Sequence, residues 1–277
     1  MRRLALPDGS RIPVIGQGTW RMGERGAERA AEAKALRAGL DLGLTLIDTA
    51  EMYGNGGAEE VTGEAIAGRR EEVYLVTKVL PQNASRKGTI QACEQSLKRL
   101  GTDHVDLYLL HWRGGHPLAE TLDAFLDLQR QGKIRSFGVS NFDPADLTEW
   151  LALPGAETTQ TNQVLYNVTA RGIEFDLLPQ QARLGIPIMS YCPLAQGDAR
   201  TLTALEPIAR RHQATAAQVL LAWVIRHPHV FAVPKSRNID RLKENAAAAD
   251  IVLSPQDLTE IDAAFPPPKK ARPLEMV

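Results

Sequence analysis

The chain has 277 residues, of which 44% are hydrophobic and 23% charged, with a formal net charge of -1 at pH 7. These proportions are typical of a soluble globular protein, and the near-neutral charge excludes a general attraction to nucleic acid or anionic membranes. Because the first apolar run is too short for a signal peptide, no run approaches a membrane span, and two cysteines are too few for a disulfide framework, we expect a cytoplasmic protein.

The chain begins with a predicted hairpin and continues as alternating strands and helices. A Pro-Asp-Gly-Ser turn at 7–10 lies between two short strand-like runs, which indicates a hairpin over residues 1–13. Apolar runs typical of buried strands cover residues 14–16, 44–47, 73–78, 105–111, 133–140, 159–164, 187–191 and 230–234. Amphipathic stretches typical of helices cover residues 27–42, 58–67, 87–100, 118–131, 144–151, a segment ending at 184, 203–211, 215–227 and 238–249.

This alternation predicts an α/β fold, a (β/α)8 TIM barrel. Eight strand–helix units follow one another with no linker-like or low-complexity segment, so we expect a single domain over residues 1–277. A further helix over 255–264 lies outside that count. The proline-rich tail over 266–277 is expected to be short, extended and mobile.

Four polar residues follow three successive predicted strands. Asp48 ends the first of these strands and Tyr53 lies on the loop beyond it, while Lys78 and His111 end the next two. The carboxyl ends of parallel strands are where α/β barrels build their active sites, so we expect these side chains to meet. Any one of them alone is more often structural, as a helix cap, a surface lysine or a satisfied histidine. Their joint placement favours catalysis.

Together the four side chains can deliver a proton to an oxygen atom. The pKa of a free tyrosine is about 10, and an ammonium about 4 Å away lowers it by at most roughly 3 pH units. We expect Asp48 to keep Lys78 charged despite burial, Lys78 to bring the pKa of Tyr53 towards neutrality, and His111 to orient a substrate oxygen. The set suits protonation of an oxygen whose carbon receives a hydride.

These four residues and their neighbours resemble the motif of a known family. The segment Asp-Thr-Ala-Glu-Met-Tyr-Gly at 48–54, Lys78 after its strand, and His111-Trp112 are similar to the Asp-Tyr-Lys-His tetrad of the aldo-keto reductases. The resemblance covers residues 16–245 and extends to the bacterial branch that reduces small aldehydes such as methylglyoxal. It implies that Tyr53 is the general acid of an NADPH-dependent reductase of aldehydes and ketones. We expect a monomer with a small carbonyl substrate and no nucleic acid or membrane partner.

The segment after the eighth predicted strand is expected to bind a phosphate group. Barrels often hold phosphate near strands seven and eight at a helix amino terminus, where cations oppose the helix macrodipole. Lys235 and Arg241 therefore suit an anionic ligand, although Asp240 and Glu244 could instead balance them on a solvated face. The resemblance implies an adenosine-phosphate site that prefers NADPH, formed by Lys235, Ser236, Asn238, Arg241, Glu244 and Asn245.

The resemblance also assigns residues to the nicotinamide end of the cofactor. Ser140, Asn141 and Gln163 match the side chains that hold the carboxamide, and Tyr191 matches the aromatic that stacks on the ring. Two loops complete the expected cofactor site with Gly18, Thr19, Trp20, Pro193 and Leu194. Cys192 stands where the family usually has serine, which puts one side-chain contact to the pyrophosphate in question.

Aromatic side chains on barrel loops are expected to line the substrate pocket. Trp20 and Trp112 suit that role, whereas Met52 is interpreted as packing within the fold. The six histidines lack the spacing of a metal site, so no metal is expected. Since one helix and a short tail follow Asn245, we expect an open pocket that accepts a broad range of small aldehydes and dicarbonyls.

Four alternative interpretations are less well supported. The Gly16-Gln17-Gly18 sequence does not continue as a dinucleotide fingerprint, and Phe142 replaces the second glycine of a nucleophile elbow around Ser140. A hydrolase with paired carboxylates would need Asp48 beside Asp106, but Asp106 begins its strand. A sensor subunit that binds NADPH with vestigial turnover is the remaining alternative, and no added interaction domain favours it.

Overall fold

The computed structural model describes residues 1–277 as alternating strands and helices. The strands are β1 (Arg3–Ala5), β2 (Arg11–Pro13), β3 (Gln17–Gly18), β4 (Leu46–Asp48), β5 (Tyr74–Val79), β6 (Val105–Leu110), β7 (Ile134–Ser140), β8 (Asn162–Leu165), β9 (Ile188–Tyr191) and β10 (Val230–Ala232). The helices are α1 (Arg29–Asp41), α2 (Gly57–Ile66), α3 (Arg86–Leu100), α4 (Leu118–Arg130), α5 (Pro144–Leu151), α6 (Leu177–Leu184), α7 (Ala199–Arg211), α8 (Ala216–Val224), α9 (Ile239–Ala247) and α10 (Pro255–Ala264).

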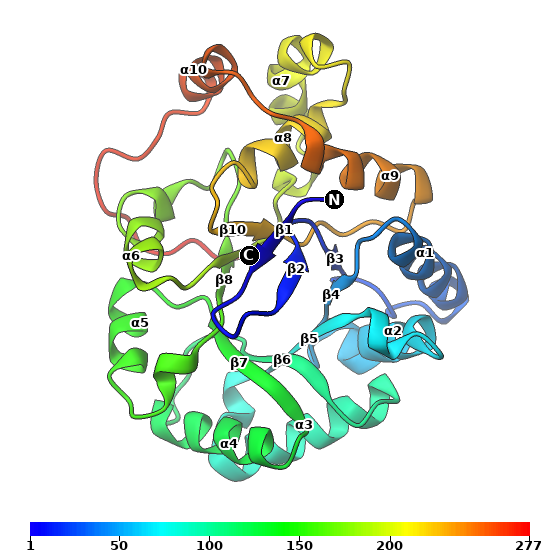
Figure 1. Ribbon diagram of the computed structural model, residues 1–277, viewed down its shortest axis with the longest axis vertical. Helices are drawn as coiled ribbons and strands as arrows, with labels where there is room; N and C mark the ends of the chain where they lie inside the picture. The colour runs from blue at the N-terminus through cyan, green and yellow to red at the C-terminus, as the bar shows by residue number, and fades with distance from the viewer.

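The eight strands from β3 to β10 form one parallel sheet that closes on itself. Each strand pairs with the next along the chain, so that Asp48 in β4 lies opposite Val76 and Lys78 in β5 lies opposite Leu109. The sheet closes where the backbone N–H of Gly16 donates to the carbonyl of Ala232 at 2.8 Å. The helices lie outside this ring (Figure 1). The predicted (β/α)8 barrel is therefore confirmed.

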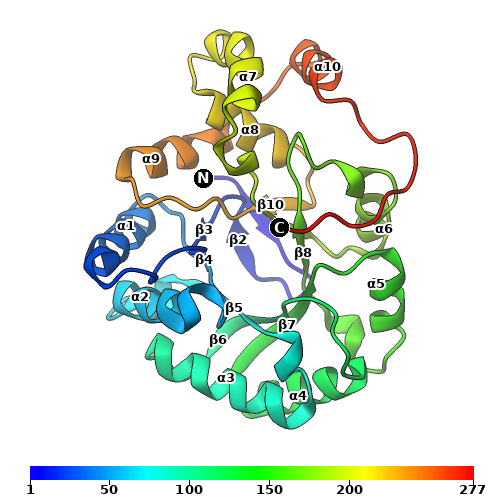
Figure 2. The ribbon, with the colours of Figure 1, turned by 180° about the vertical axis from the view of Figure 1, so that it is seen from behind.

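The amino-terminal hairpin covers one end of the barrel. Strands β1 and β2 pair antiparallel with Leu4 opposite Ile12, and both side chains are buried. The turn between them contacts the barrel where the backbone N–H of Asp8 donates to Oε1 of Gln160, just before β8 begins. The hairpin crosses the centre of the ring in Figure 1, whereas Figure 2 shows the opposite end. The predicted hairpin is confirmed, and it leaves the carboxyl ends of the strands open.

Helix boundaries follow local capping chemistry. Helix α3 begins after Ser85, whose hydroxyl accepts the backbone N–H of Gly88, and it ends at Gly101 with a left-handed φ of 63°. Helix α8 begins with a capping box between Thr215 and Gln218. These caps satisfy the backbone groups that a helix end leaves unpaired. No helix of the structure is both long and apolar enough to span a membrane.

Several predicted boundaries differ from the structure, and three of them have a clear local reason or a clear new end point. The first barrel strand is β3, later than the expected 14–16, because the backbone N–H of Val14 donates to Arg2 in the hairpin and Ile15 forms only an isolated bridge with Ala232. Strand β8 begins at Asn162 because Thr159 closes a short turn and bonds the carbonyl of Ala156. The helix predicted over 215–227 ends at Val224.

Candidate active site

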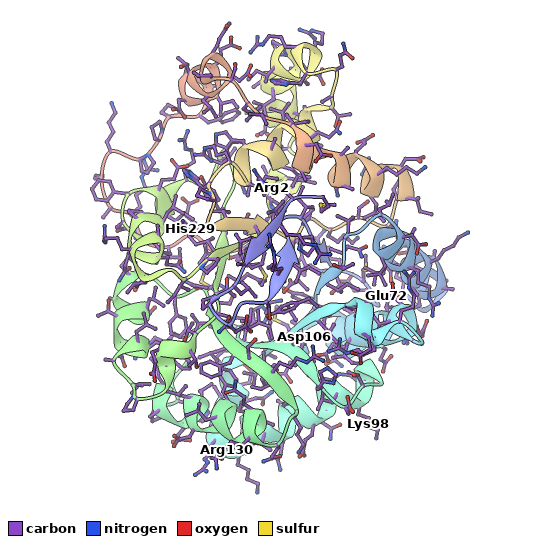
Figure 3. The ribbon with its side chains drawn as sticks, viewed as in Figure 1. Arg2, Glu72, Lys98, Asp106, Arg130 and His229 are labelled. Atoms are coloured by element: carbon purple, nitrogen blue, oxygen red, sulfur yellow. The ribbon has the colours of Figure 1, made fainter.

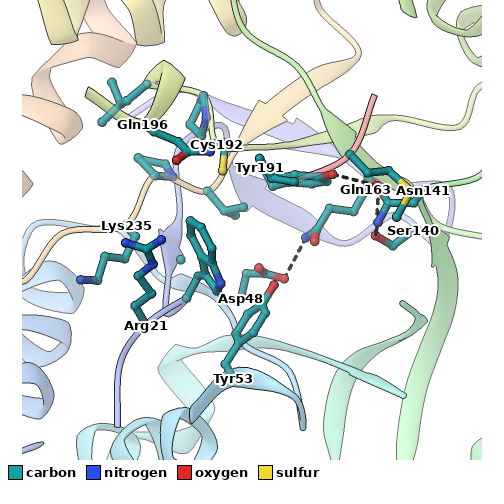
Figure 4. Close-up of a pocket in the computed structure, with 18 of the residues that line it drawn as sticks. Arg21, Asp48, Tyr53, Ser140, Asn141, Gln163, Tyr191, Cys192, Gln196 and Lys235 are labelled. Atoms are coloured by element: carbon teal, nitrogen blue, oxygen red, sulfur yellow. Dashed lines mark hydrogen bonds between the residues drawn. The ribbon is translucent and has the colours of Figure 1, made fainter. Parts of the chain in front are cut away.

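A pocket of about 670 Å³ lies at the end of the barrel opposite the hairpin (Figure 4). Most of the predicted site residues line it, although they come from segments far apart in the chain. They are Gly18, Trp20, Asp48, Tyr53, His111, Trp112, Ser140, Asn141, Gln163, Tyr191, Pro193, Leu194, Lys235 and Arg241. The structure thus brings together residues that the sequence connects only through the order of the strands.

Lys78 lies beneath this pocket, fully buried, and joins two of its residues. Its Nζ lies 2.9 Å from Oδ1 of Asp48 and donates to Oδ2 at 3.0 Å. It also donates to the carbonyl of Thr49 at 2.7 Å and to the hydroxyl of Tyr53 at 3.2 Å. The ring of His111 lies 5.8 Å from that of Tyr53. The four predicted catalytic side chains therefore form one group, with Lys78 as its centre.

The backbone around Tyr53 explains the glycines that follow it. Tyr53 begins the short 3-10 helix η2 (Tyr53–Gly56), in which Gly54 has φ 57° and Asn55 has φ 52°. A Cβ on Gly54 would lie 2.7 Å from the carbonyl oxygen of Met22, which no larger residue tolerates. Gly56 continues the left-handed path with φ 89° and leads into α2. The chain can turn away directly after Tyr53 because these positions accept a positive φ.

The prediction that Lys78 brings the pKa of Tyr53 towards neutrality is wrong for the protein side chains alone. Burial raises the pKa of Tyr53 well above its ordinary value, and the nearby Asp48 carboxylate raises it further. Burial also lowers the pKa of Lys78, and the charge of Asp48 opposes that shift. The expectation that Asp48 keeps Lys78 charged stays a prediction, because a lowered lysine pKa can still lie above neutrality. Tyr53 is thus protonated at neutral pH.

His111 is a neutral side chain at the pocket wall. Burial lowers the pKa of His111 well below its ordinary value, and the charge of Lys78 lowers it further. Its Nδ1 is buried without a hydrogen-bond partner. A neutral imidazole carries one N–H donor, so His111 can offer a hydrogen bond to a neutral oxygen in the pocket without bringing a charge.

A chain of hydrogen bonds runs along another wall of the pocket. The hydroxyl of Tyr191 donates to Oδ1 of Asn141 at 2.9 Å, and Nδ2 of Asn141 donates to Oγ of Ser140 at 3.2 Å. Ser140 donates in turn to the backbone carbonyl of Gln163 at 2.9 Å, and Nε2 of Gln163 donates to Oδ1 of Asp48 at 2.8 Å. Figure 4 shows these side chains facing the cavity. They present hydroxyl and amide groups suited to an amide ligand.

Three cations line the pocket without a carboxylate partner. Arg21, Lys235 and Arg241 border the cavity and take part in no ion pair of the structure, and Figure 4 shows Arg21 beside Lys235. Asp240 does not balance Arg241, because it pairs with Lys243 at 3.0 Å. The solvated-face interpretation of this segment is therefore not supported. Unpaired cations at a pocket favour an anionic ligand.

A model described as the Aldo/keto reductase family matches residues 14–265. This chain belongs to that family. It is 52% identical over 271 residues to the methylglyoxal reductase YeaE of Escherichia coli (strain K12), covering 96% of this chain and 95% of the relative. It is 36% identical to a glyoxal reductase of Bacillus subtilis (strain 168), covering 93% and 91% of the two chains. An aldo-keto reductase from Klebsiella pneumoniae in complex with NADPH is 48% identical, with a TM-score of 0.97 and full coverage of both chains.

Five residues of the cofactor prediction do not line the pocket of this aldo-keto reductase. Asn238 caps α9, since its Oδ1 accepts the backbone N–H groups of Asp240 and Arg241. Thr19 is buried and donates to the backbone carbonyl of Asp48 at 3.0 Å. The full set outside the lining is Thr19, Ser236, Asn238, Glu244 and Asn245. The side-chain oxygens of Thr19 and Asn238 therefore already form hydrogen bonds within the protein.

Several lining residues of the reductase were not predicted. Met52 lines the cavity and is 40% exposed, so its interpretation as packing is wrong. Arg21 has a left-handed φ of 63°, and such a turn gives no sequence signal at an arginine. The further residues are Cys192, Gln196, Gly197, Val233, Pro234, Met276 and Val277. Cys192 could have been expected, because it precedes the predicted Pro193.

The carboxyl-terminal tail contributes two residues to the lining of the pocket. Residues 266–277 contain no helix or strand, as predicted, but they run from α10 past α6 to the centre of the barrel (Figure 2). Leu274 packs against the hydrophobic core, and Met276 and Val277 then line the pocket. The expectation of an open pocket stays a prediction, because Met276 and Val277 are themselves 50% and 68% exposed. Composition alone did not show that an apolar residue would anchor the tail.

Proposed function

We propose that this aldo-keto reductase transfers a hydride from NADPH to small aldehydes and dicarbonyls, with Tyr53 as the general acid. The observation that carries the proposal is the buried hydrogen-bonded group of Asp48, Lys78 and Tyr53 at the floor of the pocket. A tyrosine hydrogen-bonded by a buried lysine can protonate the substrate oxygen directly, without a water molecule between them. His111 stands beside it as a neutral donor.

The residues of the pocket fit the proposed cofactor. Lys235 and Arg241 have no carboxylate partner, and Arg21 adds a third free cation near them, which suits the phosphates of NADPH. At the other end, Ser140, Asn141 and Gln163 offer hydroxyl and amide groups for the carboxamide, beside the ring of Tyr191. NADPH supplies the hydride when it is bound.

The proton step follows from the protein side chains. His111 and the Tyr53 hydroxyl hydrogen-bond the substrate oxygen and hold it in place. As negative charge develops on that oxygen, it becomes a far stronger base than a phenolate, so Tyr53 protonates it even with a raised pKa. Nζ of Lys78 donates to the Tyr53 oxygen and stabilises the phenolate that remains. Asp48 holds Lys78 in that position.

The pocket walls support small, uncharged substrates. Trp20, Met52, Trp112 and Met276 present apolar surface near Tyr53, and such walls discriminate weakly between small aldehydes. The relatives from Escherichia coli and Bacillus subtilis are named for methylglyoxal and glyoxal, which are small dicarbonyls. We propose methylglyoxal as a representative substrate. We further propose that the enzyme acts as a cytoplasmic monomer, since two cysteines are too few for the disulfide framework of a secreted protein.

The decisive experiment measures the loss of NADPH absorbance after methylglyoxal is added to the purified protein. We expect saturable oxidation of NADPH that depends on the aldehyde, with much slower oxidation of NADH. The Tyr53→Phe variant is the matched control, since its ring fills the same space without a proton donor. Tight binding of NADPH without aldehyde-dependent oxidation would overturn the proposal and favour a nucleotide sensor.

A further inference from the structure

One contact joins the proposed nicotinamide end of the pocket to the proposed acid. Gln163 in β8 and Asp48 in β4 come from strands four places apart in the barrel, and both side chains are almost fully buried. Nε2 of Gln163 donates to Oδ1 of Asp48 at 2.8 Å, directly across the barrel interior. Asp48 Oδ1 also lies 2.9 Å from Nζ of Lys78. The amide therefore shares an oxygen with the cation that holds Tyr53.

The chemistry of Asp48 fixes which way this amide points. A carboxylate only accepts hydrogen bonds, so the nitrogen of Gln163 must face it. The second N–H of the same group contacts Sδ of Met189, which leaves Oε1 as the free atom of the side chain. Oε1 accepts no hydrogen bond within the protein, and Gln163 lines the pocket. One amide thus has an acceptor for a ligand and a donor committed to Asp48.

We propose that Gln163 is a positioning residue that holds Asp48 for the Lys78–Tyr53 pair, while its oxygen faces the carboxamide of the cofactor. This inference rests on the proposed function and adds a second role to a residue expected only to grip NADPH. The donated hydrogen bond fills a lone pair of Asp48, which is only 3% exposed. Asp48 then keeps the orientation in which Lys78 can reach Tyr53 at 3.2 Å. The cofactor site and the proton donor consequently share one rigid group.

The charged and titratable neighbours of this contact define how it responds to pH. Lys78 from β5 and Tyr53 from η2 bond directly within the group, and His111 follows β6. Cys192 lies near Tyr53 after β9, with Tyr191 beside it, and Glu59 of α2 lies behind Lys78. No second carboxylate faces Asp48 directly. A carboxyl introduced at position 163 would therefore be the first one in direct contact with Asp48.

The variant Gln163→Glu separates the two roles. A glutamate oxygen still accepts from the carboxamide, so the dissociation constant of NADPH, measured by fluorescence, should change by less than about threefold. An ionised glutamate cannot donate to Asp48, so kcat on methylglyoxal should fall by about tenfold or more at pH values above the pKa of the new carboxyl. Burial beside Asp48 raises the pKa of the new carboxyl. As the pH is lowered, the protonated acid donates again, and the ratio of kcat between variant and wild type should recover.

Gln160→Glu is the matched control, because Gln160 is a buried glutamine only three positions away, at the hairpin end of the barrel. It should leave kcat and its pH dependence unchanged. If Gln163→Glu does not fold, Gln163→Met lacks both donor and acceptor without adding charge. It should lower kcat at saturating NADPH at every pH and weaken NADPH binding.

Two results would overturn the inference while the wild-type enzyme remains active. One is a wild-type kcat and pH profile in Gln163→Glu together with a wild-type kcat in Gln163→Met at saturating NADPH. The other is weakened NADPH binding in either variant with an unchanged kcat at saturation, which would limit Gln163 to gripping the cofactor. A wild-type protein that does not oxidise NADPH with methylglyoxal would instead refute the proposed function itself.

Discussion

Two buried aspartates, one at each end of the barrel, have different kinds of partner. Asp106 begins β6 on the hairpin side (Figure 3), where Arg70 lies 2.8 Å and Arg135 2.9 Å from its two oxygens. The backbone N–H of Leu75 donates to it at 2.9 Å. Asp48 ends β4 at the opposite end, where its partners are Lys78 and the amide of Gln163. Both carboxylates are paired, but only Asp48 lines the pocket described above.

The difference between the partners separates a structural pair from a reactive one. A guanidinium stays charged in any protein environment, so Asp106 is held by permanent cations. A buried ammonium responds to its surroundings, and burial lowers the pKa of Lys78. Lys78 also has a donor to spare for Tyr53, whereas Arg70 directs its remaining donors to Thr102 and to the carbonyls of Val73 and His104. We infer that chemistry is confined to the end where the cation is a lysine.

Among the variants that test this comparison, the one that removes the proton donor should have the largest effect on kcat. Tyr53→Phe deletes the hydroxyl that accepts from Lys78 and should lower kcat on methylglyoxal by at least about a thousandfold. The dissociation constant of NADPH should change little, because the ring still fills its space. Stopped-flow or steady-state NADPH oxidation, together with fluorescence titration, measures both quantities. A variant that keeps more than a few per cent of wild-type turnover would show that another group is the acid.

Lys78→Met should lower kcat by at least about a hundredfold, since it removes the cation that stabilises the phenolate. It also leaves Asp48 buried without a counter-charge, which destabilises the fold by about 3–5 kcal/mol. The double variant Asp48→Asn with Lys78→Met restores neutrality and should recover most of that stability in urea denaturation. Its kcat should stay low. Recovery of kcat together with stability would mean that Lys78 serves the fold alone.

At the hairpin end we expect the opposite pattern, which is a loss of stability without a loss of kcat. Asp106→Asn leaves Arg70 and Arg135 without their anion, and should lower the free energy of unfolding by about 2–3 kcal/mol. This is less than for a fully buried pair, because the Arg135 side chain is 57% exposed. The kcat and KM of the folded enzyme should equal those of the wild type. A loss of kcat without a loss of stability would contradict the division between the two ends.

The sequence predicts the reactive end because strand order alone brings its residues together. Asp48, Lys78 and His111 each end or follow an apolar run, and parallel strands place all such ends on one face. The family resemblance assigns Ser140 and Gln163 to the site but does not say where their side chains lie. What it could not supply is the bond between Gln163 and Asp48, because a contact across the barrel depends on the closed sheet.

Other errors have the same physical origin. The direction of the pKa shift of Tyr53 depends on burial, which outweighs a neighbouring cation and cannot be read from residue types. The path of the tail depends on Leu274 packing against the barrel, which brings Met276 to the pocket from outside the barrel. Arg21 reaches the pocket through a turn that its residue type disfavours. Sequence patterns give the order of elements, whereas these features depend on packing between distant ones.

Arg241 extends the comparison to a cation with no carboxylate partner, and its removal should have the smallest effect of the series. It lines the pocket and forms no ion pair, so the proposed ribose phosphate of NADPH would be its counter-charge. Charge-assisted hydrogen bonds contribute about 1.5–3 kcal/mol each, so Arg241→Ala should weaken NADPH binding by at least about tenfold. NADH lacks that phosphate and its dissociation constant should barely change. Lys243→Ala, which removes a cation already paired with Asp240, is the control and should alter neither. Equal weakening of both cofactors by Arg241→Ala would instead place Arg241 on a part that NADPH and NADH share.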